Sequence, residues 1–130
     1  MVTGHGVELS APARNLECGM AAIDCGADAV YIGGPAFGAR EAVSNSVADI
    51  SKLIKYAHKY RASVYITINT ILFDYEFPKA VSLIEQFYEL EADGIIIQDM
   101  GLVEYGLPPI PIMASTQTHN TDPEKIRFFE

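Results

Sequence analysis

The chain has 130 residues, of which 49% are apolar and 20% are charged. This composition is typical of one globular domain and unlike that of disordered or collagen-like chains. The 17 acidic residues outnumber the 9 basic ones and give a net charge of −8. We therefore expect no nucleic-acid binding by this chain alone, because phosphate contacts need clustered lysine and arginine.

Short apolar segments alternate with amphipathic segments along the first half of the chain. Asn15 and Ser46 are good helix N-caps, Gly26 is a natural helix stop, and Pro12 interrupts a strand pattern. In order, we expect a strand over 7–11 stopped by Pro12, a helix over 15–26, a strand over 29–32, a long loop from Gly33, and a helix over 46–60.

The same alternation continues in the second half. Pro78 sits where the first turn of a helix tolerates proline, and Pro108 and Pro109 separate a helix from a strand. The pattern predicts a strand over 63–69, a helix from about residue 78, a strand over 94–98, a short helix over 100–105, a strand over 110–114 and a last helix beginning at 121–124.

This order predicts an α/β fold with a parallel sheet, since strands joined by helices run parallel. The consecutive isoleucines at 95–97 indicate a strand covered on both faces. We expect one domain over residues 1–130, shaped as a partial TIM-barrel-like array of about five βα units; a five-stranded flavodoxin-like open sheet is the alternative. A weak internal repeat, in which Asp28 and Asp93 each precede a strand, favours the barrel type.

The two cysteines, Cys18 and Cys25, lie seven residues apart in a predicted helix. Their Cα atoms would be about 10 Å apart, which is too far for a disulfide. We expect both thiols to be buried in a reducing cytoplasm, the compartment that the lack of a secretory signal in residues 1–6 also favours. No metal site is expected, because two cysteines are too few and no His-Glu-x-x-His pattern exists.

Ligands of parallel α/β folds gather beyond the carboxyl ends of the strands, and this rule selects the candidate site residues. Asp99 is the carboxylate best placed for acid–base work, although it could instead cap the short helix. Arg40 would hold an anionic group, unless it is a solvated loop arginine. The expected substrate-binding residues are polar: Asn45, Asn69, Gln117 and His119.

Several blocks of the sequence resemble peptidase family U32, the collagenase-like peptidases. The run Glu8–Glu17 resembles the family's opening block, except that Arg14 stands where the family usually has glycine. The segments 22–34, 37–45, 56–69, 93–99 and 115–120 follow in the family's order. The resemblance implies the N-terminal portion of a barrel, peptide-bond hydrolysis and a peptide or other polar substrate.

The same resemblance leaves two other functions open. Related proteins take part in hydroxylation of RNA or of quinone precursors and carry an iron–sulfur cluster on cysteines, but those cysteines lie beyond this chain. No cofactor is therefore expected within it. A non-catalytic binding or assembly module is the third possibility.

A sheet cut from a barrel has two unpaired edges that invite pairing with another chain. We also expect its inner face to expose apolar side chains that the rest of the barrel would cover. The chain is therefore predicted to be a homo-oligomer or to need a missing C-terminal half. The inner-face residues expected to be exposed include some of Val30, Ile32, Val64, Ile66, Ile95, Ile97 and Ile112.

Overall fold

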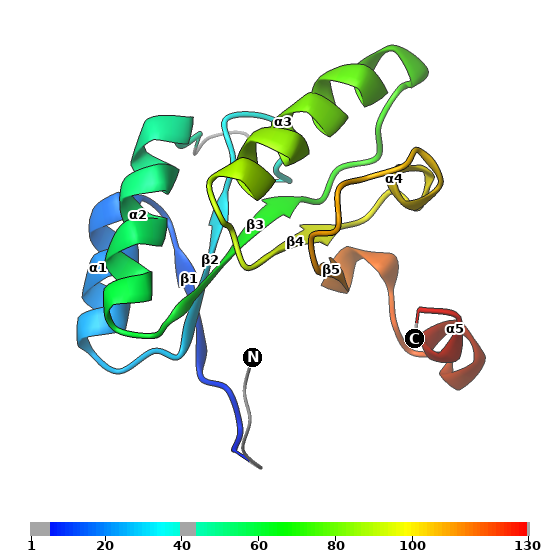
Figure 1. Cartoon of the computed structure of the whole chain (residues 1–130). Helices are drawn as coiled ribbons and strands as arrows, with labels where there is room; N and C mark the ends of the chain where they lie inside the picture. The colour runs from blue at the N-terminus through cyan, green and yellow to red at the C-terminus, as the bar shows by residue number, and fades with distance from the viewer. Residues whose placement is uncertain (1–5, 40–43, 130) are drawn as a thin grey trace.

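The structure is a computed structural model that describes residues 6–39 and 44–129. Strands and helices alternate as the sequence predicts, with boundaries that differ by a few residues (Figure 1). The elements are β1 (Ser10–Ala13), α1 (Leu16–Asp24), β2 (Ala29–Gly33), α2 (Val47–Lys59), β3 (Ser63–Ile68), η1 (Asp74–Glu76), α3 (Phe77–Glu89), β4 (Gly94–Ile97), α4 (Gly101–Glu104), β5 (Ile112–Ala114), η2 (Thr116–Thr118) and α5 (Pro123–Phe128).

All five strands pair in parallel in the order β1-β2-β3-β4-β5. The predicted parallel α/β class is therefore confirmed. The sequential order is that of a sector of a (βα) barrel, whereas a flavodoxin-like sheet would begin 2-1-3. Over the described residues the sheet is open, with β1 and β5 at its edges. None of the helices described is long and apolar enough to span a membrane.

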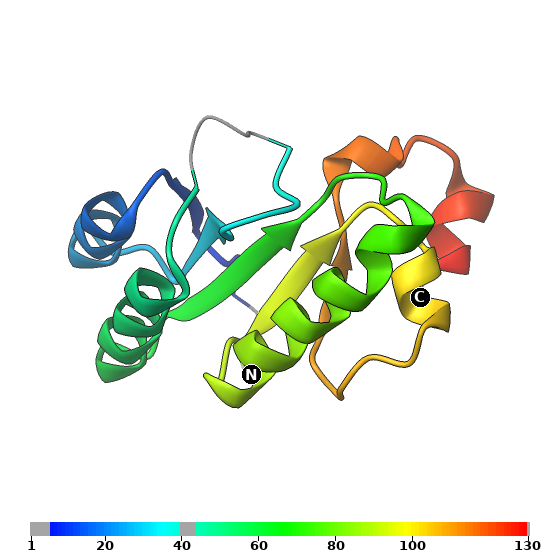
Figure 2. The same ribbon diagram turned by 90° about the horizontal axis from the view of Figure 1, so that it is seen from above.

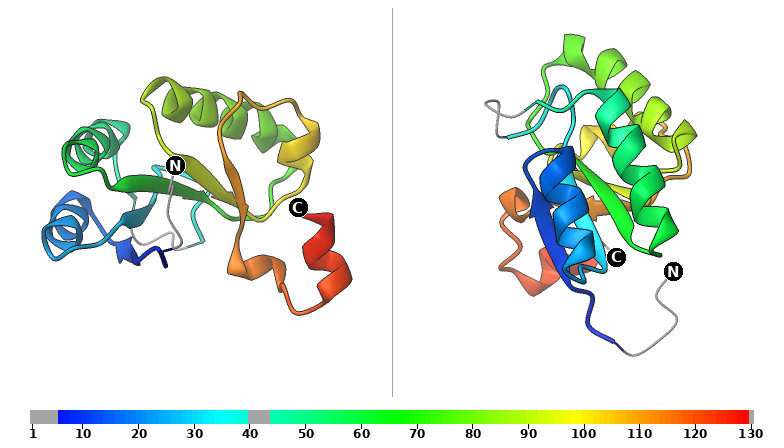
Figure 3. Two further views of the ribbon diagram at one scale, coloured as in Figure 1. Left: turned by 60° about the horizontal axis from the view of Figure 1, so that its bottom comes forward. Right: turned by 90° about the vertical axis from the view of Figure 1, so that its left-hand side faces the viewer.

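Helices α1, α2 and α3 follow one another around one face of the sheet, as the left view of Figure 3 shows. The strand residues on this face alternate along each strand and are buried almost completely, as in any sheet packed against helices. They are Val30, Ile32, Val64, Ile66, Ile68, Ile95 and Ile97. The expectation that some of these side chains lie exposed on the inner face is therefore wrong, because the helices of this chain already cover them.

The opposite, concave face carries the intervening residues. Tyr31 of β2 pairs in register with Tyr65 of β3, and Thr67 follows two positions later. These side chains are partly exposed. The Tyr65 hydroxyl donates to Glu8 Oε2 at 3.0 Å, and burial together with this hydrogen bond raises the pKa of Tyr65 above its ordinary value of 10.0. Over β2 and β3 the inner face is thus polar and aromatic, whereas Ile96 and Met113 continue it over β4 and β5 with apolar side chains.

Strand β1 begins later than predicted and contains Pro12, which was expected to end it. An edge strand tolerates proline because it pairs on one side only and does not need every N–H. The chain enters β1 through Leu9, whose N–H donates to Asp28 Oδ2 at 2.8 Å. Proline therefore marks β1 as an edge strand.

The three long helices end in the same way. The residue after the helix cap takes a left-handed φ, which is 98° at Gly26, 60° at Arg61 and 63° at Glu91. The next residue is a buried alanine that donates its N–H to a carbonyl five residues back, as in a Schellman motif. These bonds run from Ala27 to Ala22, from Ala62 to Ala57 and from Ala92 to Phe87, each 3.0 Å long.

The internal repeat around Asp28 and Asp93 has a structural counterpart. Each aspartate follows a Schellman turn, precedes a strand, and accepts a backbone N–H from the chain at the start of the previous strand. Asp28 Oδ2 accepts from Leu9, and Asp93 Oδ2 accepts from Val64, both at 2.8 Å. The repeat therefore encodes the same βα junction twice.

The cysteines do not lie where they were expected. Cys18 and Cys25 are free and exposed, so the prediction that both are buried is wrong. The buried stripe of α1 consists of Gly19 and Ile23 instead, which places Cys18 on the other side of the helix. Of the residues expected to be exposed on the inner face, Ile112 alone is exposed, and it lies on the helix side of the edge strand β5. The predicted oligomer or missing half stays a prediction.

Candidate functional site

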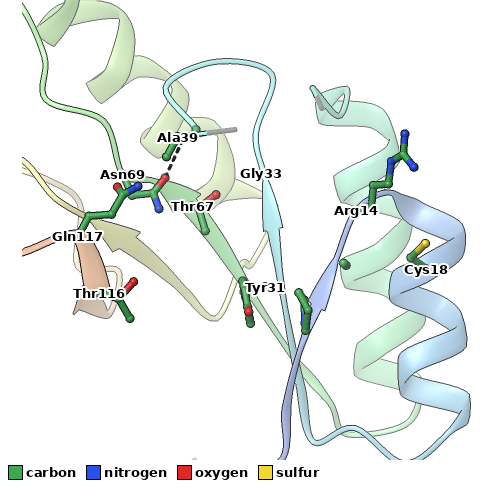
Figure 4. A pocket seen from close by; sticks show the side chains of 12 residues that line it. Arg14, Cys18, Tyr31, Gly33, Ala39, Thr67, Asn69, Thr116 and Gln117 are labelled. Atoms are coloured by element: carbon green, nitrogen blue, oxygen red, sulfur yellow. Dashed lines mark hydrogen bonds between the residues drawn. The ribbon is translucent and has the colours of Figure 1, made fainter. Parts of the chain in front are cut away.

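A cleft of about 510 Å³ opens on the concave face at the carboxyl ends of the strands. Figure 2 shows β3 and β4 pointing toward the edge where the loop after β2 and segment η2 gather. Tyr31 lies on one side of the cleft, and Thr116 and Gln117 lie on the other (Figure 4). Pro12 also lines the cleft. The other lining residues are Ala13, Arg14, Cys18, Gly33, Gly38, Ala39, Thr67 and Asn69.

Asn45 holds one rim of this cleft together. It is 6% exposed. Its Nδ2 donates to the Arg14 carbonyl at 3.2 Å and to the Gly33 carbonyl at 3.0 Å. Both amide hydrogens are thereby used, and the ends of β1 and β2 are tied together. Asn45 was predicted to bind substrate; in the structure it positions Arg14 and Gly33, which line the cleft.

Asn69 directly follows β3 and faces the cleft, where a strand-end residue was expected. Its Oδ1 accepts from the Ala39 N–H at 3.0 Å (Figure 4), and its Nδ2 donates to Ser115 Oγ at 3.4 Å. These two bonds fix the orientation of the amide. One hydrogen on Nδ2 and one lone pair on Oδ1 remain for a ligand.

Gln117 reaches the cleft from η2, after β5. The buried Ser115 caps this segment, since its Oγ accepts from the Gln117 N–H at 3.2 Å. Gln98 Nε2 donates to the Gln117 carbonyl at 3.5 Å. The Gln117 backbone is thus anchored while its exposed side chain points into the cleft beside Asn69 (Figure 4).

Asp99 follows β4 but does not line the cleft. Its Oδ2 accepts from the Leu72 N–H and its Oδ1 from the Gly101 N–H, both at 2.9 Å. The carboxylate therefore joins the loop after β3 to the start of α4, which is the capping arrangement weighed as an alternative. Its proposed acid–base role stays a prediction that this geometry does not favour.

Two other predicted site residues lie elsewhere. His119 ends η2 in a left-handed conformation (φ 54°) and is exposed outside the cleft lining. Arg40 lies outside the described residues. Of the predicted set, Asn69 and Gln117 line the cleft and Asn45 frames it.

Tyr31 and Thr67 line the cleft but were not selected by the strand-end rule, because they lie within β2 and β3. Strand alternation would have found them. Val30 and Ile32 face the helices, so the residue between them must face the other side.

The described residues contain no group of three or more His, Cys, Asp or Glu side chains that could hold a metal ion. Cys18 lines the cleft rim, but Cys25 is at the far end of α1. An iron–sulfur cluster needs several converging thiolates, and the two cysteines of this chain do not converge. The chain therefore does not fit such a cluster by itself.

Comparison with known proteins gives one family. The model for "Peptidase family U32" matches residues 14–130. The chain is 48% identical over 127 residues to the 23S rRNA 5-hydroxycytidine C2501 synthase of Escherichia coli. The matched segment covers 98% of this chain and 19% of that protein. It is 30% identical to tRNA hydroxylation protein P1 of Bacillus subtilis, over 95% of this chain and 30% of that protein.

Proteins named for proteolysis are also similar. The collagenase of Porphyromonas gingivalis is 30% identical, over 94% of this chain and 30% of that protein. The solved structure of the U32 peptidase Mk0906 matches 96% of this chain and 55% of its own, with a TM-score of 0.74 and 14% identity. That likeness concerns the fold. The chain spans about a fifth to a third of the length of the three curated relatives named.

Proposed function

The chain belongs to peptidase family U32, and we propose that it forms the substrate-binding part of a protein that hydroxylates RNA. The observation that carries this proposal is the 48% identity to an rRNA 5-hydroxycytidine synthase over 98% of the chain. Relatives named as tRNA hydroxylation proteins add support at 30% and 37% identity. Peptide hydrolysis is the first function that the sequence suggested. It is supported by a relative named collagenase, to which this chain is 30% identical.

The cleft is consistent with substrate holding. Its lining among the described residues offers amides, hydroxyls, an aromatic ring, one thiol and one guanidinium, and it includes no carboxylate or imidazole. Such a set orients a polar, anionic substrate through hydrogen bonds and charge. Peptide hydrolysis by a carboxylate or imidazole acid–base group therefore finds no such group among the described lining residues, and the thiol of Cys18 is the strongest nucleophile among their side chains.

The reaction that we propose adds one hydroxyl group to a cytosine base in ribosomal RNA. This chain would bind the RNA segment and orient the base. Replacing a ring C–H by C–O–H removes two electrons from the base, so an oxidant and a source of the oxygen atom would have to be supplied from outside the described residues. The exposed Cys18 and Cys25 are compatible with a cytoplasmic location, where thiols stay reduced.

The test is to delete the gene and analyse the nucleosides of the organism's own ribosomal RNA by mass spectrometry. Deletion is expected to remove a cytidine that is one oxygen atom heavier, and a plasmid copy of the full-length gene should restore it. An unchanged nucleoside profile in the deletion strain, checked for transfer RNA as well, would contradict the proposal.

The purified full-length protein should be incubated with gelatin in parallel. Cleavage that is lost in the Asn69→Ala variant, combined with an unchanged nucleoside profile, would restore the peptidase assignment.

A further inference from the structure

The charge in the cleft has the opposite sign to the charge of the chain. The chain carries a net charge of −8, yet Arg14 is the one charged side chain among the described residues that line the cleft. Its backbone is fixed by the Asn45 amide at 3.2 Å. In Figure 4 its side chain rises from the β1–α1 loop at the outer rim, on the opposite side of β1 from Asn69 and Gln117. An isolated guanidinium at the rim of a polar cleft is suited to a phosphate or carboxylate.

The floor of the cleft presents an aromatic ring. Tyr31 lies on β2, which pairs with strands on both sides, and it is nevertheless 37% exposed. Its exposure comes from the cleft, where no helix covers it. In Figure 4 the Tyr31 ring stands between strand β1 and Thr116. An exposed tyrosine in a cleft offers a surface on which a base can stack.

The wall beyond Tyr31 carries paired donors and acceptors. Asn69 has one free donor and one free acceptor position, in an orientation held by Ala39 and Ser115. The exposed Gln117 side chain lies beside it (Figure 4). Two neighbouring amides of this kind can pair with the edge of a base, which alternates donors and acceptors in the same way.

We propose that this cleft binds one unstacked nucleotide of the RNA, with its base on Tyr31, the edge of the base toward Asn69 and Gln117, and a phosphate on Arg14. This assignment rests on the proposed function and locates its substrate. A volume of about 510 Å³ is within the usual range for a small-ligand pocket. Enzymes that modify a base commonly take it out of its stack into such a pocket.

The expectation that this chain alone does not bind nucleic acid is compatible with the assignment. That expectation concerns affinity for a long phosphate backbone, which needs many cations. A single nucleotide needs one phosphate contact and a place for its base. Most of the affinity for the RNA would then come from elsewhere in the full-length protein.

The experiment measures binding of the full-length protein to a short single-stranded RNA with one central cytidine, by fluorescence anisotropy at several salt concentrations. Tyr31→Ala should weaken binding about fivefold or more, because it removes the stacking surface, and Tyr31→Phe should bind nearly as the wild type does. Arg14→Gln should weaken binding and lower the salt dependence by about 0.7 in the slope of log K against log salt.

Two matched controls lie outside the cleft. Tyr88→Ala removes a similarly exposed tyrosine from α3, and Arg61→Gln removes one positive charge at the turn after α2. Both are expected to leave RNA binding unchanged. Equal binding by Tyr31→Ala and Tyr88→Ala, or equal salt slopes for Arg14→Gln and Arg61→Gln, would overturn the assignment. So would a wild-type protein that does not bind the RNA.

The nucleoside analysis separates this assignment from the proposed function. Hydroxylated RNA in cells, together with RNA binding that is insensitive to both cleft changes, overturns the nucleotide site and leaves the function. Binding that depends on Tyr31 and Arg14 in a protein that hydroxylates no RNA supports the site and overturns the function.

Discussion

On strand β3, Val64, Ile66 and Ile68 are fully buried against the helices, whereas Tyr65 and Thr67 between them face the concave side and stay partly exposed. One face of the sheet therefore supplies the buried apolar area that stabilises the fold. The other face supplies polar and aromatic groups to the cleft. Alternate residues along a strand therefore serve different roles, stability on the helix side and ligand binding on the concave side. Substitutions on the two faces should have different consequences.

The largest expected difference in stability lies between neighbouring residues of β3. Ile66→Ala removes a side chain with 0% exposure and should lower the free energy of unfolding by about 2–5 kcal/mol. Thr67→Ala, on the concave face, should lower it by less than about 1 kcal/mol. Urea unfolding followed by circular dichroism measures both. Equal losses would show that the concave face is as important for stability as the helix face.

Asp99 lies at the end of a strand but outside the cleft, so its substitution should affect stability and leave ligand binding unchanged. Asp99→Ala leaves the N–H groups of Leu72 and Gly101 without their acceptor. The free energy of unfolding should fall by about 1–3 kcal/mol. Asp99→Asn should lose less, since its amide oxygen still accepts one bond. Hydroxylation per folded molecule is expected to be retained in the Asn variant, and its loss without any loss of stability would restore Asp99 as an acid–base residue.

Glu91 lies at the end of the sheet opposite the cleft and should affect stability alone. It holds a left-handed φ of 63° in the turn after α3, where Gly26 occupies the equivalent turn after α1. Glu91→Gly should raise the free energy of unfolding by about 0.5–1 kcal/mol, because glycine takes this conformation without strain. A higher urea midpoint with unchanged RNA affinity is the expected result. A lower midpoint would mean that the glutamate side chain outweighs the strain.

Tyr65 gives the smallest effect, confined to alkaline pH. Burial and the hydrogen bond to Glu8 raise its pKa above 10.0 in the folded state. The folded state therefore holds this proton more tightly, so the contribution to stability is complete below pH 10 and is lost as the pH rises further. Tyr65→Phe should flatten the fall of the melting temperature above pH 10, and Glu8→Gln should flatten it in part. An identical alkaline slope in all three proteins would exclude this coupling.

The parts of the fold that could be predicted from the sequence are those set by local interactions. Asn15, Ser46 and Asp122 each accept a backbone N–H in the first turn of a helix, at the positions expected for caps. The start of β1 could not be placed, because the tolerance for Pro12 depends on its strand lying at the edge. The side of α1 on which the cysteines lie was also missed, since it is decided by packing against α2.

The candidate site was predicted in part for a similar reason. The strand-end rule found Asn69 and Gln117, because parallel strands bring their ends together. It also selected Asn45 and Asp99, whose polar groups are used by backbone partners far away in the sequence. Which side chains keep free hydrogen-bonding groups depends on those distant partners, and sequence position alone does not reveal it.

The central claim is that the concave cleft holds the nucleotide that is hydroxylated, and one measurement tests it most directly. The deletion strain should be supplied with full-length genes carrying Tyr31→Ala or the control Tyr88→Ala at equal protein levels, and the hydroxylated cytidine of its ribosomal RNA quantified. We predict a large loss for Tyr31→Ala and wild-type levels for Tyr88→Ala. Wild-type hydroxylation with Tyr31→Ala would contradict the account.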